Sequence, residues 1–392
     1  MPVPSAHDSP EQEHEVTTLE LFFDLVFVFA MSQLSHHLLA DLSWRGAGET
    51  LVMLVAIFTV WFRTSWSATI IPADQSRTFW LMLAVMLLGL FMNASVTGAF
   101  TISGWAFVIP YLLIQLGRTL WAYFNAPDAA YREHYVRVLI WLIPTFPLWI
   151  AGAAANSDVR LLLWGLAAGI DLLGSWLAHP VPGRRLHSES MSFDASHMLE
   201  RCRLLLLIAL GETILTTGGA IAESPVLLIT IVTGTAAFVG TIALWALTFK
   251  HSQRVLTSRF RHETVDPIRI SRYTVNALIG LIAGLIAIAV GNELVIAHPE
   301  GEPSIALNLL LFGGPILYLL TQSWFLQAVP QDSMRLRLIG SAVLAVAGFV
   351  LLTAPPYIAL ILAAAILTGL TLLDQRTTKP VQVQQLEESH HE

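Results

Sequence analysis

Charged residues are scarce in this chain. Only 12 % of its 392 residues are Asp, Glu, Lys or Arg, whereas 55 % are hydrophobic, and the mean hydropathy is +0.65. A soluble domain carries about 25 % charged residues, so this chain has too few polar groups to cover a globule of its size in water. The composition therefore predicts an integral membrane protein whose main surroundings are a lipid bilayer.

Cysteine and the common cofactor motifs are also nearly missing. With a single cysteine, Cys202, the chain can form no internal disulfide and no cysteine metal site. The sequence holds no Gly-rich phosphate-binding loop and no Gly-x-Ser-x-Gly nucleophile elbow. Its basic residues are too few to indicate a nucleic-acid partner. We therefore expect a protein that is not an enzyme and that uses no cofactor, no metal and no nucleic acid.

What the chain does have is a series of apolar runs long enough to cross a bilayer. About 20 apolar residues span the hydrocarbon core as a helix, and these runs lack the period-two alternation of a membrane barrel. The sequence therefore predicts an all-α polytopic fold with twelve transmembrane helices. The predicted spans are 17–39, 51–72, 79–100, 105–124, 138–155, 161–179, 204–222, 226–250, 273–297, 305–327, 338–354 and 357–373.

The basic residues give an independent indication of topology. Of the 21 Lys and Arg residues, 17 fall on the side of the predicted membrane that holds both termini. Two more, Arg45 and Arg160, fall on the opposite side, and the last two, Arg63 and Arg118, lie within spans. Cytoplasmic loops carry the excess of Lys and Arg. We therefore expect a multi-pass protein of the cell membrane with both termini in the cytoplasm.

The two halves of the chain open alike. TTLELFFDLVFVFA and HMLERCRLLLLIALGET each combine Leu-Glu with a helix that carries an acid. Six spans in each half would insert both halves in the same orientation, as a parallel repeat; chance similarity between Leu-rich helices is the alternative. The expected division is a polar cytoplasmic tail at 1–16, a first six-helix repeat at 17–179, a cytoplasmic linker at 180–203, a second repeat at 204–373 and a polar cytoplasmic tail at 374–392.

Four carboxylates fall within or at the edge of predicted spans, namely Glu20, Asp24, Asp171 and Glu212. An ionisable group inside the bilayer costs at least a few kcal/mol, so it normally faces protein or water and has a partner. At 1.5 Å per residue, the deeper three lie roughly 8–12 Å from the cytoplasmic end of their spans. We predict that these carboxylates bind an ion, a proton or a substrate, with Asp24 and Glu212 as the main sites.

Three arginines, Arg63, Arg118 and Arg201, are expected to face these carboxylates and to set their protonation or to meet an anionic group. Purely structural interpretations are also open. Asp24 and Arg63 could form only an ion pair that locks two helices. Glu20 could only favour the positive end of its helix, and Arg118 could reach the headgroups along its stem.

Two of these stretches resemble the signature of the bacterial low temperature requirement A (LtrA) family. LELFFDLVFVFAMSQLS resembles the first-helix motif of that family, and HMLERCRLLLLIALGETIL resembles its second motif, around the Leu-Gly-Glu step. The resemblance extends over essentially the whole chain and implies a bacterial membrane protein connected with growth in the cold. FFDLVFVFAMSQL is also similar to the first helix of a potassium-channel family with two six-helix repeats, although Phe23 stands where that family has serine.

These observations favour a transport protein that moves a cation or a proton-coupled small solute through buried carboxylates. A passive cation channel is the first alternative, and a membrane-structural or sensory protein for growth in the cold is the second. An intramembrane enzyme acting on lipids would need a nucleophile or a metal with a base, and no such set of residues stands out. The identity of the ion or solute and the oligomeric state, a dimer included, are left open.

Overall fold

The computed structural model describes residues 16–71, 76–183, 193–260, 267–325 and 331–377, and the regular elements in these ranges are helices. The all-α prediction is confirmed. In chain order the elements are α1 (Thr18–Ala40), α2 (Trp44–Ile70), α3 (Ser76–Ala94), η1 (Val96–Gly98), α4 (Gly104–Asn125), α5 (Ala129–Ala154), α6 (Ser157–Leu177), α7 (Ala195–Glu223), α8 (Leu228–Phe260), α9 (Pro267–Ala297), α10 (Ile305–Asn308), η3 (Leu309–Gly313), α11 (Gly314–Phe325), α12 (Gln331–Val350) and α13 (Pro356–Thr377).

Eleven helical stretches in the described ranges are long and apolar enough to cross a membrane. One of them joins α10, the π-helical turn η3 and α11 into a single span. The remaining long helix, α12, packs between α11 and α13. The polytopic membrane fold is therefore confirmed. Some helices extend beyond the predicted apolar runs: α2 begins at Trp44 rather than at residue 51, and α7 at Ala195 rather than at 204.

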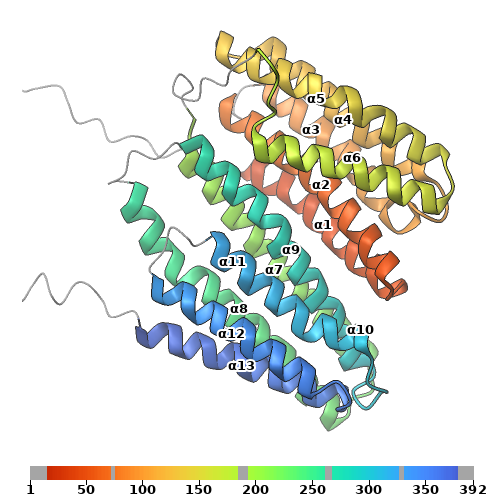
Figure 1. The fold of residues 1–392 in the computed structure, drawn as a ribbon, viewed down its shortest axis with the longest axis vertical. Coiled ribbons are helices and arrows are strands. Elements are labelled where there is room, and N and C mark those ends of the chain that lie inside the picture. Colours follow the sequence, from red (N-terminus) through yellow and green to blue (C-terminus); the bar gives the residue numbers. More distant parts are fainter. Residues whose placement is uncertain (1–15, 72–75, 184–192, 261–266, 326–330, 378–392) are drawn as a thin grey trace, which may run out of the picture.

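The helices form two groups, α1–α6 and α7–α13, which lie on opposite sides of the molecule (Figure 1). Each group has the same succession of neighbours. In the first, α1 packs on α2 and α3, and α3–α4–α5–α6 follow in order until α6 meets α2. In the second, α7 packs on α8 and α9, and α9–α11–α12–α13 follow until α13 meets α8. We call the face at which α1 begins and α13 ends the terminal face.

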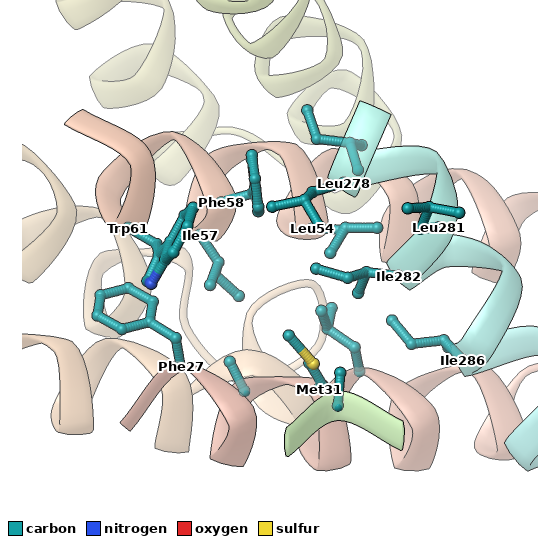
Figure 2. Packing of buried hydrophobic residues seen from close by; sticks show 14 of the residues in the cluster. Phe27, Met31, Leu54, Ile57, Phe58, Trp61, Leu278, Leu281, Ile282 and Ile286 are labelled. Carbon is teal, nitrogen blue, oxygen red and sulfur yellow. The ribbon is translucent and has the colours of Figure 1, made fainter. Parts of the chain in front are cut away.

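The two groups meet along α1, α2 and α6 of the first and α7 and α9 of the second. Figure 2 shows the apolar part of this contact, where Met31 of α1 and Leu54 and Phe58 of α2 lie beside Leu278 and Ile282 of α9. All five side chains are buried. Lipid chains are as apolar as these residues, so close packing rather than removal from water holds such helices together. The polar groups described below are set into this contact and beside it.

Glycines bring α9 and α11 into close approach. A Cβ atom on Gly284 would lie 2.9 Å from the carbonyl oxygen of Gly314 and 3.1 Å from the Cβ atom of Tyr318. Gly314 is placed reciprocally, since its own Cβ atom would lie 3.1 Å from the carbonyl oxygen of Gly284. The two backbones can therefore be this near only because neither residue has a side chain.

We predict that Gly284→Ala lowers the free energy of unfolding by about 1–3 kcal/mol, the usual cost of overpacking a close contact. The measurement is thermal or denaturant unfolding of the purified protein in detergent. Gly218→Ala on α7 is the matched control, because nothing lies within 4 Å of a Cβ atom there. Equal stability of the two variants would contradict the proposed tight contact.

Candidate functional site

Asp24 lies at the contact between the two helix groups. Its Oδ1 atom accepts hydrogen bonds from Trp61 Nε1 on α2, at 2.7 Å, and from Arg201 Nη2 on α7, at 2.8 Å. The side chains of Asp24 and Arg201 are both 0 % exposed. The sequence left open an ion pair between Asp24 and Arg63, and that pairing is wrong: the partner of Asp24 comes from the other half of the chain.

Glu20 belongs to the same cluster. Its Oε1 atom lies 3.5 Å from Arg201 Nη1, and its Oε2 atom lies 3.3 Å from His197 Nε2. Glu20 also completes a capping box, in which its backbone N–H donates to the Thr17 hydroxyl while its carboxylate accepts from the Thr17 backbone N–H. Glu20 therefore does lie at the positive end of its helix and stabilise it, as one interpretation of the sequence suggested. It also forms an ion pair between the two helix groups.

Asp171 is the centre of a second cluster, inside the first helix group. Arg63 Nη2 donates to its Oδ1 atom at 3.0 Å, and Tyr111 donates its hydroxyl to Oδ2 at 2.9 Å. Trp149 Nε1 donates to Oδ2 at 3.4 Å. These partners come from α2, α4 and α5, so one carboxylate on α6 links four helices through hydrogen bonds. Its lone pairs are largely occupied by protein donors.

Arg118 has a different environment. It is 2 % exposed, so it does not reach toward the headgroups. Its guanidinium donates to neutral acceptors: the backbone carbonyl of Arg63 at 3.1 Å, Gln115 Oε1 at 2.9 Å and Thr119 Oγ1 at 3.0 Å. No carboxylate oxygen of the described residues lies within 4.0 Å of it. Arg118 is therefore a buried cation that has hydrogen-bond partners but no counter-ion in this part of the chain.

A pocket that is partly open to solvent lies beside Arg63 and Arg118. Helices of both groups enclose it, since Trp66 of α2 and His134 of α5 line it together with Arg272 of α9. Helix α4 and the end of α6, with the two residues that follow it, also contribute to the wall. The pocket is thus basic, and none of the four carboxylates predicted as site residues lines it.

His179 forms part of this wall immediately after α6. Arg63 Nη2 lies 3.4 Å from its Nε2 atom, and since an arginine can only donate, the histidine nitrogen accepts and the ring is neutral. Burial, followed by the positive charge of Arg63, holds the pKa of His179 well below its ordinary value of 6.5. Ala178 and His179 adopt left-handed φ angles of 56° and 52°, and Arg137 donates to both of their carbonyl oxygens.

Glu212 stands apart from both clusters. It lies on α7, roughly 16 Å from the C-terminal end of that helix at 1.5 Å per residue. Its side chain is half-buried. No hydrogen bond or ion pair joins its carboxylate to a residue in the described ranges. The predicted single layer of four carboxylates facing three arginines is thus divided into two paired clusters and one carboxylate that has no protein partner there.

Several residues of these clusters escaped the sequence analysis. Arg137 was counted with the basic residues of one membrane face, as was Arg337 outside the clusters, yet both are buried and bonded within the helices. Gln115 and Tyr111 are polar and uncharged, so they carried no signal in a search for charges. Within the described ranges no group of three His, Cys, Asp or Glu side chains could hold a metal ion.

Comparison with known proteins decides the family. The family model described as "Bacterial low temperature requirement A protein (LtrA)" matches residues 15–372. The chain belongs to the LtrA family. A relative from Rhizobium meliloti (strain 1021), "Uncharacterized protein RA0937", is 31 % identical over 310 residues, which is 78 % of this chain and 75 % of that protein. No solved structure gives a significant match.

The two LtrA-like motifs have a clear structural position. The first lies on α1 and supplies Glu20 and Asp24, whereas the second lies on α7 and supplies His197, Arg201 and Glu212. Four of these five residues make the polar contact between the two helix groups. The most distinctive stretches of sequence are therefore largely those that join the halves of this LtrA protein.

We predict that Arg201→Gln lowers the free energy of unfolding by about 3–5 kcal/mol, because it leaves two buried carboxylates without their counter-ion. Asp24→Asn combined with Arg201→Gln should be less destabilised than Arg201→Gln alone, since the double variant buries one charge fewer. Unfolding of the four proteins in detergent gives the double-mutant cycle. Strictly additive losses would contradict direct coupling between Asp24 and Arg201.

The stability of the protein should fall as the pH is lowered past 6.5, in part because of His179. The unfolded chain binds a proton at this residue near pH 6.5, whereas the folded protein does so only at a lower pH. The unfolded state therefore gains up to about 1.4 kcal/mol per pH unit below that value. His179→Gln should lose less stability than the wild type between pH 7.5 and 5.5, and the exposed His298→Gln should behave like the wild type.

Proposed function

We propose that this LtrA protein is a membrane transport protein that moves a small solute coupled to protons. The basic pocket supports this proposal most directly. It lies toward the terminal face, it reaches Arg63 and Arg118 inside the spans, and helices of both groups enclose it. A polar pocket inside a polytopic bundle is the usual setting of a solute site, because ionisable groups within a membrane are otherwise too costly to keep.

The arrangement of the two groups supports alternating access. Each group has the same order of helix neighbours, as a parallel repeat would have. The two groups also place similar residues at corresponding helices: α4 carries Tyr111 and Gln115, and α11 carries Tyr318 and Gln322. Rocking of one repeat against the other would expose a pocket between them to each side of the membrane in turn.

The partners of the carboxylates favour a proton-coupled solute over a passive cation channel. Asp24 and Asp171 are both bonded to arginines, so their charges are largely compensated inside the protein. A cation pathway would need uncompensated acidic groups, and the described residues around the pocket are basic instead. Glu212, which has no partner among the described residues, is the carboxylate that we assign to the coupling proton.

The orientation of the protein follows from its basic residues. The terminal face, which carries most of them, would be cytoplasmic under the positive-inside rule, and the protein would reside in the cell membrane. The pocket would then open toward the cytoplasm in the conformation described here.

Flux measurements on proteoliposomes test the transport function. We predict that reconstituted wild-type protein moves protons together with a solute across the vesicle membrane, read by an internal pH dye while a panel of small organic anions, neutral solutes and alkali cations is supplied outside. Glu212→Gln should reduce the coupled proton flux at least tenfold, because an amide cannot take up and release the proton.

Glu223→Gln is the matched control, since it makes the same change at an exposed position on the same helix. It should transport like the wild type. Absence of flux with every solute in the panel would contradict the transport function. Proton flux that survives in Glu212→Gln would instead remove Glu212 from the coupling step.

A further inference from the structure

We propose that the basic pocket binds an oxyanion, meaning a carboxylate or phosphate head group attached to an apolar body. The claim that such an anion is the transported solute rests on the transport function proposed above. Binding itself depends only on the residues that line the pocket.

Positive charge is in excess around the pocket. Three arginines line the pocket, Arg63 and Arg118 from the first helix group and Arg272 from the second. Asp171 compensates Arg63, whereas no carboxylate of the described residues lies within 4.0 Å of the guanidinium groups of Arg118 or Arg272. Two positive charges therefore face this space without a counter-ion from the described part of the chain. A buried charge without a counter-ion is costly, and a bound anion removes that cost.

The residues that line the pocket also have hydrogen-bond donors without a partner among the described residues. Arg63, Arg118 and Arg272 each have a buried Nε atom without a hydrogen-bond partner among the described residues, and so does the indole Nε1 atom of Trp66. All four residues line the pocket. Guanidinium groups match the planar or tetrahedral oxygens of carboxylates and phosphates, to which they donate in pairs. A cation offers no acceptor for any of these groups.

His179, which lines the pocket, is consistent with this assignment. His179 accepts from Arg63 through Nε2, so its proton is on Nδ1, and that atom has no partner among the described residues. The ring thus adds a neutral donor rather than a competing negative group.

Part of the pocket lining is apolar. Phe62, Val138 and Ile268 line the same pocket as the arginines, and each is buried. A fully hydrated inorganic ion gains little from such a wall, whereas an amphipathic anion can set its head group on the arginines and its body against these side chains. A small organic acid in solution and the phosphate of an anionic lipid share this chemistry.

Binding to the purified full-length protein in an uncharged detergent tests the inference. Octanoate and hexyl phosphate are titrated as soluble anions, phosphatidylglycerol is titrated in mixed micelles, and hexylammonium serves as the cationic counterpart at constant ionic strength. We expect saturable binding of at least one anionic probe and none of hexylammonium. Binding of the lipid alone would identify a headgroup as the occupant, and binding of the soluble anions would identify a free organic acid.

Arg118→Gln should weaken binding at least tenfold, and Arg118→Lys, which keeps the charge, should weaken it less. Arg77→Gln is the matched control, because it removes the same charge at an exposed site near the same face and should bind like the wild type. Arg272→Gln is the second pocket variant. The Arg272 guanidinium makes no hydrogen bond to a described residue, so its loss removes no such bond from the fold. It should also weaken binding even if Arg118→Gln does not fold.

The inference is overturned if no anionic probe binds to the wild type, or if the folded pocket variants bind like Arg77→Gln. The outcome of this binding test can be distinguished from the outcome of the flux test of transport. Anion binding without flux of any solute would contradict transport and leave the anion site intact. Flux of a cation or neutral solute without anion binding would contradict the anion site and leave the transport function intact.

Discussion

An ionised side chain inside a bilayer must find a partner within the protein, and this requirement organises the structure. Arg201 is completely buried between the two helix groups, and it is held there by Asp24 and Glu20 of the opposite group. Its guanidinium also lies 5.4 Å and 5.9 Å from the ring centroids of Phe23 and Trp61, where a cation is attracted by the aromatic face. Without these contacts the apolar surfaces alone would not specify how the halves meet, because lipid competes with them equally well.

Helix α2 connects the polar clusters. Trp61 donates to Asp24 at the contact between the groups, and Arg63, two residues further on, donates to Asp171 and lines the basic pocket. A displacement of α2 would therefore disturb the ion pairs between the halves and the pocket together. Helix α2 is therefore the physical link between the contact of the two groups and the pocket.

The sequence predicted that the carboxylates bind the solute or ion and that the arginines are their partners, whereas the structure favours the opposite assignment for most of these residues. Three of the four acidic residues in the spans act as counter-ions for arginine, which suits a structural function. Among the charged side chains of the clusters and the pocket, those without a counter-ion in the described ranges are the two arginines Arg118 and Arg272 and one carboxylate, Glu212. A solute site therefore has its best support where the protein has an excess of donors, and a proton site where one carboxylate has no partner in the described ranges.

The sequence by itself determined the membrane class, the order of the helices and the family, because these depend on long apolar runs and on two extended motifs. It also identified Asp24, Asp171 and Arg63 as buried charges. Only the tertiary structure decided which charges pair, since Asp24 and Arg201 are 177 residues apart and their contact depends on how the two groups dock. The pocket could not be predicted for the same reason: its walls come from five helices, and its polar lining includes Trp66, whose chemistry becomes visible only once its neighbours are known.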